Sequence, residues 1–297
     1  MTHNKYFLFF TLMFAGGCIK AQSLLDELNK SYDGAPEYEI AIFKSSRISI
    51  GHSTETLKKG VLEIGARSRF WNIPDKESQS FVADKMNTRF SLEYGINDRL
   101  TFGTGITTLD GIFDTFLKYK IVRQQKKGFP FGITFFQNGA YQSKKPSIGD
   151  IHASGAFEDK LAFTSQLLVS KKVTPQFSVQ VSPTFIHRAS SVFEEDPSNH
   201  FALGIGGRYK IGGHVSIVSE YYNVFNSIKS RDTYNAFSLG VNWELSDVML
   251  QFQMTNTRSV EENAFITQTS NNFNTRDGNF VFGFTGIFVL HLHNCLK

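Results

Sequence analysis

The feature that most constrains this chain is an alternation of apolar and polar residues that recurs about twelve times from Gly60 onward. Alternate residues of a β-strand point to opposite faces, so each run predicts a strand with one apolar and one polar face. The first run places Leu62 and Ile64 on one face and Glu63 and Arg67 on the other. The runs cover residues 61–71, 89–96, 100–107, 116–121, 129–135, 161–169, 177–185, 201–209, 215–221, 237–244, 248–255 and 280–290.

Charged residues occupy the same parity on many of these runs, whereas the opposite parity is almost uncharged. A large soluble β-protein with one wet face per sheet is the alternative interpretation, but it does not explain this shared parity. Aromatic residues make up 14% of the chain, with 30 Phe, which suits membrane-interface girdles. We therefore predict an all-β fold: a closed antiparallel transmembrane β-barrel of about twelve strands, because an open sheet edge cannot be satisfied in lipid.

The connections between the runs predict the same architecture, because short and long ones alternate strictly along the chain. Outer-membrane barrels have short periplasmic turns and longer outer loops. The short connections are residues 97–98, 123–128, 171–176, 212–213 and 246–247, and the longer ones are 72–85, 109–113, 139–160, 188–199, 226–234 and 257–278.

The first 21 residues have the three parts of a secretory signal, with an apolar run too short for a spanning helix of roughly twenty residues. We expect cleavage between Ala21 and Gln22; a lipobox-like approach to Cys18 leaves a lipoprotein as the alternative. The predicted organisation is a signal peptide at 1–21, an N-terminal periplasmic or plug segment at 22–59, and a transmembrane barrel at 60–297. A short amphipathic helical turn is expected at 24–30. The expected location is the outer membrane of a Gram-negative bacterium.

Several blocks of this sequence are similar to a known family. They are SLLDEL at 23–28, FKSSR at 43–47, GHS at 51–53, ETLKKG at 55–60, LEYG at 92–95, NDRL at 97–100 and FLKYK at 116–120. The chain resembles an uncharacterised family of outer-membrane β-barrels from Bacteroidetes-type bacteria, domain of unknown function 5777, over nearly its whole mature length. The resemblance implies the fold and the location but no activity. The final residues, 290–297, depart from it because they do not end on the aromatic residue that usually closes a last strand.

The polar parity supplies the candidate site, a set of charged side chains expected to face the lumen. A positive excess would make the lumen prefer anions, whereas pairing of Arg with Glu across the interior would plug it. Both interpretations remain open at this stage. The lumen-facing candidates are Glu63, Arg67, Arg69, Arg89, Glu93, Lys118, Lys120, Arg208, Lys210, Glu220 and Glu244. On the same parity argument Leu239 faces lipid and Ser238 the lumen, where an arginine is tolerated better unless it clashes with a plug.

Other motifs carry little chemistry. The glycines of Gly204-Ile205-Gly206-Gly207 lie inside a strand with no following helix, so they do not predict a dinucleotide site; inward glycines more plausibly admit bulky neighbours. Three further groups are compatible with metal binding, but an exposed tail and solvated loops explain them better: His291 with His293 and Cys295, then Asp150 with His152 and Glu158, then Glu194 with Glu195 and Asp196. We predict no catalytic residues, no metal, no cofactor and no nucleic-acid binding.

The expected function is a narrow passive channel or a conduit for small or hydrophobic solutes. A closed barrel with a structural or partner-binding role is the main alternative. A soluble binder in the export compartment and an outer-membrane enzyme are lesser ones. Outer-membrane lipid and the barrel-assembly machinery are the expected partners, and the sequence does not identify a solute.

Overall fold

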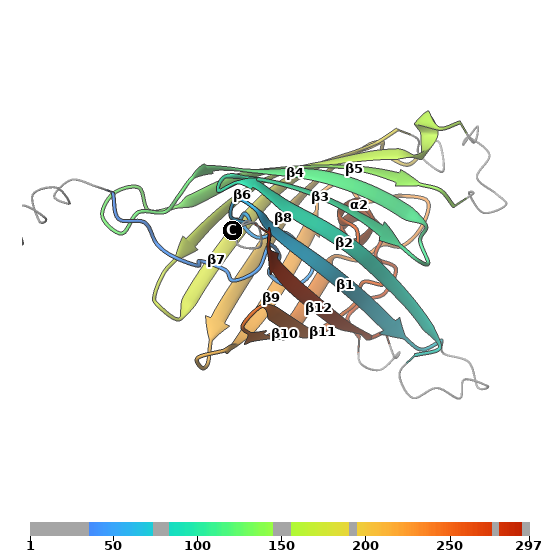
Figure 1. The fold of residues 1–297 in the computed structure, drawn as a ribbon. Coiled ribbons are helices and arrows are strands. Elements are labelled where there is room, and N and C mark those ends of the chain that lie inside the picture. Colours follow the sequence, from blue (N-terminus) through green and yellow to red (C-terminus); the bar gives the residue numbers. More distant parts are fainter. Residues whose placement is uncertain (1–35, 74–82, 145–155, 190–194, 275–278, 293–297) are drawn as a thin grey trace, which may run out of the picture.

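In the computed structural model, which describes residues 36–73, 83–144, 156–189, 195–274 and 279–292, twelve strands form one closed antiparallel barrel (Figure 1). Each strand pairs with its neighbours in the sequence, and β1 closes the barrel by pairing with β12. The predicted fold class is therefore confirmed. The elements are β1 (Val61–Trp71), β2 (Lys85–Asn97), β3 (Leu100–Thr107), β4 (Ile112–Val122), β5 (Gly132–Gln142), η1 (Glu158–Lys160), β6 (Leu161–Lys172), β7 (Phe177–Arg188), β8 (Asn199–Lys210), β9 (Val215–Val224), β10 (Ala236–Leu245), β11 (Val248–Thr255), α2 (Glu262–Thr267) and β12 (Val281–His291).

The two faces of the wall follow the parity of the sequence. On β2 the side chains of Phe90 and Leu92 are exposed on the outside, while Ser91 and Glu93 are buried inside. Burial of polar residues and exposure of large apolar ones inverts the pattern of a soluble protein, and a surrounding of lipid explains it. None of the described helices is long and apolar enough to cross a membrane.

Several strand boundaries differ from the sequence prediction, and those of the fifth and fourth strands affect the inner and outer faces most. The fifth strand was expected at 129–135, but β5 runs from Gly132 to Gln142. The alternation is hidden there because Gln137 lies on the outer, apolar parity, where its amide oxygen accepts a hydrogen bond from Ser165 Oγ at 2.6 Å. The fourth strand begins at Ile112, four residues earlier than expected, which places Asp114 on the inner face.

The connections do not alternate strictly in length, so that prediction is wrong in detail. The β4–β5 connection, residues 123–131, has nine residues at the end of the barrel where turns are short, which we call the turn end. The β3–β4 connection, residues 108–111, has four residues at the opposite, loop end. The longer turn has a structural cause: its backbone accepts a hydrogen bond from Glu39 N at Gln124 O, and Tyr38 forms an isolated bridge with Gln125.

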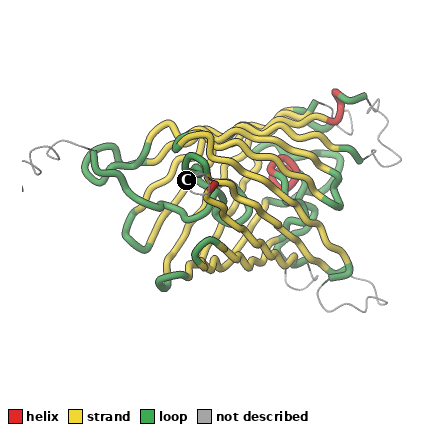
Figure 2. The backbone as a smooth tube through the Cα atoms, in the orientation of Figure 1, coloured by secondary structure: helices red, strands yellow, loops and turns green. Residues whose placement is uncertain are grey.

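The expected signal peptide, the helical turn at 24–30 and Cys18 lie outside the described residues. The described chain starts at the turn end, passes into the barrel and returns to that end before β1, as the tube in Figure 2 shows. At the loop end, the β11–β12 connection folds into the barrel and carries α2.

Candidate functional site: the plugged lumen

The lumen contains a hairpin-like segment, residues 42–54, which we call the plug. Its turn is closed by Ile48 N donating to Gly51 O at 3.0 Å, and Ser53 N donates to Ser46 O at 2.9 Å. Its small polar residues and its apolar ones are nearly all buried. A segment that belongs to no strand of the wall therefore fills the middle of the barrel.

A single carboxylate of the wall holds the tip of the plug. Glu220 Oε2 on β9 accepts hydrogen bonds from the backbone N–H groups of Ser49, Ile50 and Gly51 at 2.8, 2.6 and 3.0 Å. Gly51 is needed for this approach, because a Cβ there would lie 1.8 Å from the hydroxyl of Tyr222. Charge-assisted bonds from backbone amides are among the stronger polar contacts in proteins. Glu220 therefore fixes the depth of the plug.

Further polar side chains bind the backbone of the plug along its length. Lys118 Nζ donates to Ser46 O at 2.8 Å, and Gln180 Nε2 donates to His52 O at 2.7 Å. Thr134 Oγ1 donates to the carbonyl oxygen of Thr54 at 2.8 Å. These bonds satisfy buried carbonyl groups, as a segment without sheet partners requires.

Apolar contacts of the plug gather in two clusters. Ile50 packs with Tyr222 of the wall and Phe265 of α2, and the ring centroids of these two aromatic residues are 5.3 Å apart. Ile42, Phe43 and Ile48 pack with Val218 of β9 in the second cluster. The imidazole of His52 also packs on two aromatic rings of the wall, and hydrogen bonds such as those described above make many of the remaining contacts.

A second element enters from the loop end, the inner loop of residues 256–274. Glu261 is the N-cap of its helix α2, and its side-chain oxygens accept hydrogen bonds from the N–H groups of Asn263 and Ala264, both at 3.2 Å. Asn138 Nδ2 of β5 donates to Glu261 Oε1 at 3.3 Å and to Glu262 Oε2 at 3.2 Å. The cap and this amide hold the two adjacent buried carboxyl groups of Glu261 and Glu262 against the wall.

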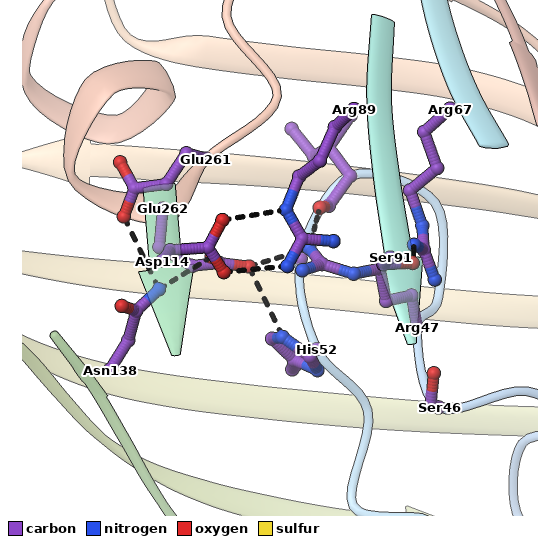
Figure 3. Close-up of polar contacts among 12 residues, drawn as sticks. Ser46, Arg47, His52, Arg67, Arg89, Ser91, Asp114, Asn138, Glu261 and Glu262 are labelled. Atoms are coloured by element: carbon purple, nitrogen blue, oxygen red, sulfur yellow. Dashed lines mark hydrogen bonds and ion pairs between the residues drawn. The ribbon is translucent and has the colours of Figure 1, made fainter. Parts of the chain in front are cut away.

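A buried ion pair joins the plug to the inner loop in the middle of the lumen (Figure 3). Arg47 Nη1 of the plug lies 2.5 Å from Glu262 Oε1 of the inner loop, and both side chains are fully buried. His52 Nε2 lies 3.3 Å from the same oxygen, and the imidazole packs against the rings of Phe116 and Phe136. The two elements thus close the barrel from opposite ends and are joined to each other.

The wall contributes its own buried ion pairs. Arg89 of β2 binds Asp114 of β4 with two bonds, Nε–Oδ1 at 2.9 Å and Nη2–Oδ2 at 2.6 Å. The guanidinium crosses the intervening strand β3 over Gly105, where a Cβ would lie 2.5 Å from its Cζ. Arg67 Nη2 contacts Glu63 Oε1 at 3.4 Å and Glu93 Oε1 at 3.3 Å.

All the charged residues that the sequence places in the lumen lie on the inner parity of their strands. Seven are almost completely buried, while Arg208 pairs with Glu244 near the turn end and Lys120 with Glu55. Lys210 is half-buried in the last position of β8. The seven are Glu63, Arg67, Arg69, Arg89, Glu93, Lys118 and Glu220.

Sequence reasoning missed the residues that join these charges into one network. Arg47 and His52 lie in a segment without alternation, and Glu261 and Glu262 lie in a connection expected to be an outer loop. Asp114 was missed because the fourth strand was started too late, although its inner parity carries the signal. Asp114 and Glu262 compensate much of the positive excess expected from the wall alone.

The other candidate residues show no metal-binding arrangement among those described, where no group of three or more His, Cys, Asp or Glu side chains could hold an ion. Asp196 instead accepts hydrogen bonds from Lys229 N and Ser230 N, both at 2.9 Å, so it orders the β9–β10 loop. Glu158 lies in η1 and His291 ends β12 near Asp247. Asp150, His152, Glu194, His293 and Cys295 lie outside the described residues.

Burial shifts the pKa values of His52 in the plug and Glu261 in the inner loop in opposite directions. Burial, followed by the nearby charges of Arg47 and Lys118, lowers the pKa of His52 well below its ordinary value, so the imidazole stays neutral. Burial, followed by the neighbouring carboxylates of Glu262 and Asp114, raises the pKa of Glu261 from 4.5 to about 8. Glu261 therefore holds a proton at neutral pH.

This protonation predicts a pH-dependent stability. Because the folded protein binds a proton that the unfolded chain releases, the stability contributed by Glu261 is complete below about pH 4.5 and is lost as the pH rises to about 8. Glu261→Gln keeps an acceptor for the helix cap but does not titrate, so it should flatten this part of the profile. Denaturant unfolding measured across that pH window tests the expectation, with Glu158→Gln as an exposed control. An unchanged slope in Glu261→Gln would contradict it.

With the geometry described, comparison with known proteins identifies the family. A family model described as a membrane bound beta barrel domain matches residues 43–290, from the plug to the last strand. The chain belongs to this family. Membership in the membrane bound beta barrel family rules out the soluble alternative and confirms the resemblance. It also includes the plug, because the matched region begins at Phe43. No curated protein matches the chain.

Solved structures share part of the architecture at low sequence identity. The KdgM porin has a TM-score of 0.49 at 10% identity, covering 77% of this chain and 99% of its own. The NanC porin has a TM-score of 0.47 at 11% identity, with coverages of 77% and 98%. An outer membrane channel from Pseudomonas putida F1 has a TM-score of 0.47 at 13% identity, with coverages of 84% and 100%. Such distant overlaps do not transfer an activity to this protein.

Proposed function

We propose that this membrane bound beta barrel is an outer-membrane channel for small solutes that the plug closes at rest. The observation that carries the proposal is that residues 42–54, which form no part of the wall, occupy the lumen through a mainly polar interface. Polar contacts can be exchanged for contacts with water, so a plug of this kind can leave without exposing a large apolar surface. The wall remains a complete barrel without it, because every strand pairs with two other strands.

The covalent attachment of the plug also permits movement. On its C-terminal side it joins β1 through residues 55–60, where the backbone is anchored to the β2–β3 turn by Thr56 Oγ1 and Lys59 N, which donate to Asp98 at 2.9 and 3.1 Å. On its N-terminal side Tyr38 stacks with Arg123, whose Cζ lies 4.4 Å from the ring centroid. These anchors hold the two ends of the plug at the rim while leaving its middle bound only by side chains and by its own turn.

The lumen that opens when the plug leaves would discriminate little between anions and cations. Without the plug, seven basic side chains of the predicted set remain on the wall, and they face the carboxylates of Glu63, Glu93, Asp114, Glu220 and Glu244 together with that of Glu262. A pore with mixed charges prefers neither cations nor anions strongly. We infer that the solute is small and either neutral or zwitterionic.

The outer membrane of a Gram-negative bacterium is the proposed location, with the turn end in the periplasm. Short turns face the periplasm in such barrels, and the N-terminal segment enters from that side, as expected for a chain exported behind a signal peptide. The barrel-assembly machinery and outer-membrane lipid are the corresponding proposed partners. A passive role of this kind needs no catalytic group.

A closed structural barrel is the second candidate, and one observation favours it. The Arg47–Glu262 pair joins the two plugging elements where water has no access, and breaking a buried pair is costly. A barrel in which this pair never separates would serve as a rigid membrane element without transport.

Conductance distinguishes the two candidates. The variant should carry a flexible Gly/Ser linker in place of residues 42–54, and its folding should be checked by the mobility of unboiled protein in detergent gels. We expect steady ion conductance in planar bilayers from the linker variant and only rare openings from the natural sequence. Glu37→Gln, an exposed change beside the same rim, is the matched control and should behave as the natural sequence does. A folded linker variant that does not conduct would favour the structural role.

A further inference from the structure

A groove on the lipid-facing surface of the described barrel is not used by the channel proposal. It lies over β6, β7 and β8 and has a volume of about 470 Å³. Sites that hold small molecules have volumes of about 300–1,000 Å³. Its apolar lining includes Leu167, Pro183, Phe185, Phe201, Leu203 and Phe225.

An interruption of the β6–β7 ladder accompanies the groove. Gln166 pairs with Thr184 and Val169 pairs with Val181, but between them Leu167 and Leu168 of β6 form no pairing with Pro183 and Ser182 of β7. Proline has no N–H to donate, and it is normally kept to edge strands, which a closed barrel does not have. The ladder is therefore weakened in the middle of the membrane-spanning wall.

The groove reaches deeper than the outer surface of the wall. Gln166 and Thr184 point inward and are almost completely buried, yet both line the groove. Gln166 Nε2 donates to Thr184 Oγ1 at 3.1 Å, which closes the floor toward the lumen. The sides of the groove extend toward the loop end of the barrel. There Phe185 and Phe201 pack with ring centroids 5.2 Å apart, and Phe225 follows the end of β9.

We propose that this groove binds one acyl chain of a membrane lipid from the leaflet at the loop end. The groove is continuous with the apolar outer face of the barrel, whose contact with lipid follows from its membrane-bound family. An acyl chain fits a lining of aliphatic and aromatic side chains, and water would find few partners there.

The opposite wall provides a matched control surface. Phe252 of β11 and Phe284 of β12 form a similar aromatic pair, with ring centroids 5.3 Å apart. Their ladder is continuous, because every residue from Val248 to Thr255 pairs with β12. Both surfaces contact lipid in a bilayer, but only the groove should retain a chain when the bilayer is removed.

Photolabelling tests the proposal on the full-length barrel. The protein is folded into vesicles that contain a phospholipid with a photoreactive acyl chain, transferred to detergent, washed free of loose lipid and irradiated. Mass spectrometry of the peptides should find adducts near Phe185 and Phe201 and none near Phe252 and Phe284. Equal labelling of the two surfaces, or no retained lipid, would overturn the proposal.

Variants of the groove test whether the photoreactive lipid is retained specifically there. Leu203→Trp fills the groove and should abolish the retained label, whereas Leu92→Trp, at an exposed position on the outer face of β2, should keep it. Should Leu203→Trp fail to fold, Phe225→Ala removes part of the rim from outside the strands and should also lose the label. Retention that is unchanged in the folded groove variants, or a small apolar solute found there in place of lipid by native mass spectrometry, would contradict the assignment.

Discussion

Asp114→Ala is expected to lower the free energy of unfolding of the barrel by roughly 3–5 kcal/mol, the cost of leaving a buried charge without its partner. Arg89 would then remain fully buried between β2 and β4 with both of its bonds to the carboxylate lost. Denaturant unfolding of the detergent-folded protein measures the change. Loss of the Arg89–Asp114 pair should have a large effect on the free energy of unfolding, because water cannot reach the charge left behind.

Two further variants separate the loss of the pair from a general loss of packing. The double replacement Arg89→Met with Asp114→Leu should recover most of the stability, because two apolar side chains leave no unpaired charge. Glu37→Ala removes an exposed pair with Lys126, separated by 3.4 Å, and should change stability by about 0–1 kcal/mol. A large loss in Glu37→Ala, or none in Asp114→Ala, would contradict the assignment.

Leu239→Arg is expected to destabilise the barrel by roughly 2–4 kcal/mol if the side chain lies near the middle of the bilayer. Leu239 is on the outer face of β10 with 47% of its surface exposed, where an arginine would face lipid. Folding yield into liposomes and the unfolding free energy are the measurements. Leu239→Phe, which stays apolar, is the control and should fold as well as the natural sequence.

Ser238→Arg, one residue away, should affect the plug rather than the folding of the barrel. Ser238 is completely buried, and its hydroxyl lies 2.6 Å from that of Ser49 in the plug. An arginine there would occupy the place of the plug tip, so we expect a folded barrel with a displaced plug. A cysteine introduced at Ser49 should become accessible to water-soluble thiol reagents in this variant alone. Loss of folding equal to that of Leu239→Arg would show that the two positions do not face different environments.

The alternation of the sequence was sufficient to predict the wall. A strand that faces lipid on one side and a polar interior on the other must alternate, so strand number, parity and closure can all be predicted from local pattern. Where Gln137 interrupts the outer face, the pattern fails, because a neighbouring serine satisfies the amide and no sequence signal shows that contact. The predicted start of β4 was four residues late and hid Asp114, although the inner parity of Asp114 could be read from the sequence.

What the sequence by itself determined is a closed membrane barrel with charges on its inner face, because the solvent on each side of a strand selects the residue types there. Only the tertiary structure decided what those charges do. Arg47 and Glu262 are separated by 215 positions in the chain, and neither lies in a periodic segment. Their pairing depends on the plug entering from the turn end and the inner loop entering from the loop end. The three-dimensional path of two irregular segments, which have no repeating pattern to read, therefore fixes the closed state of the lumen.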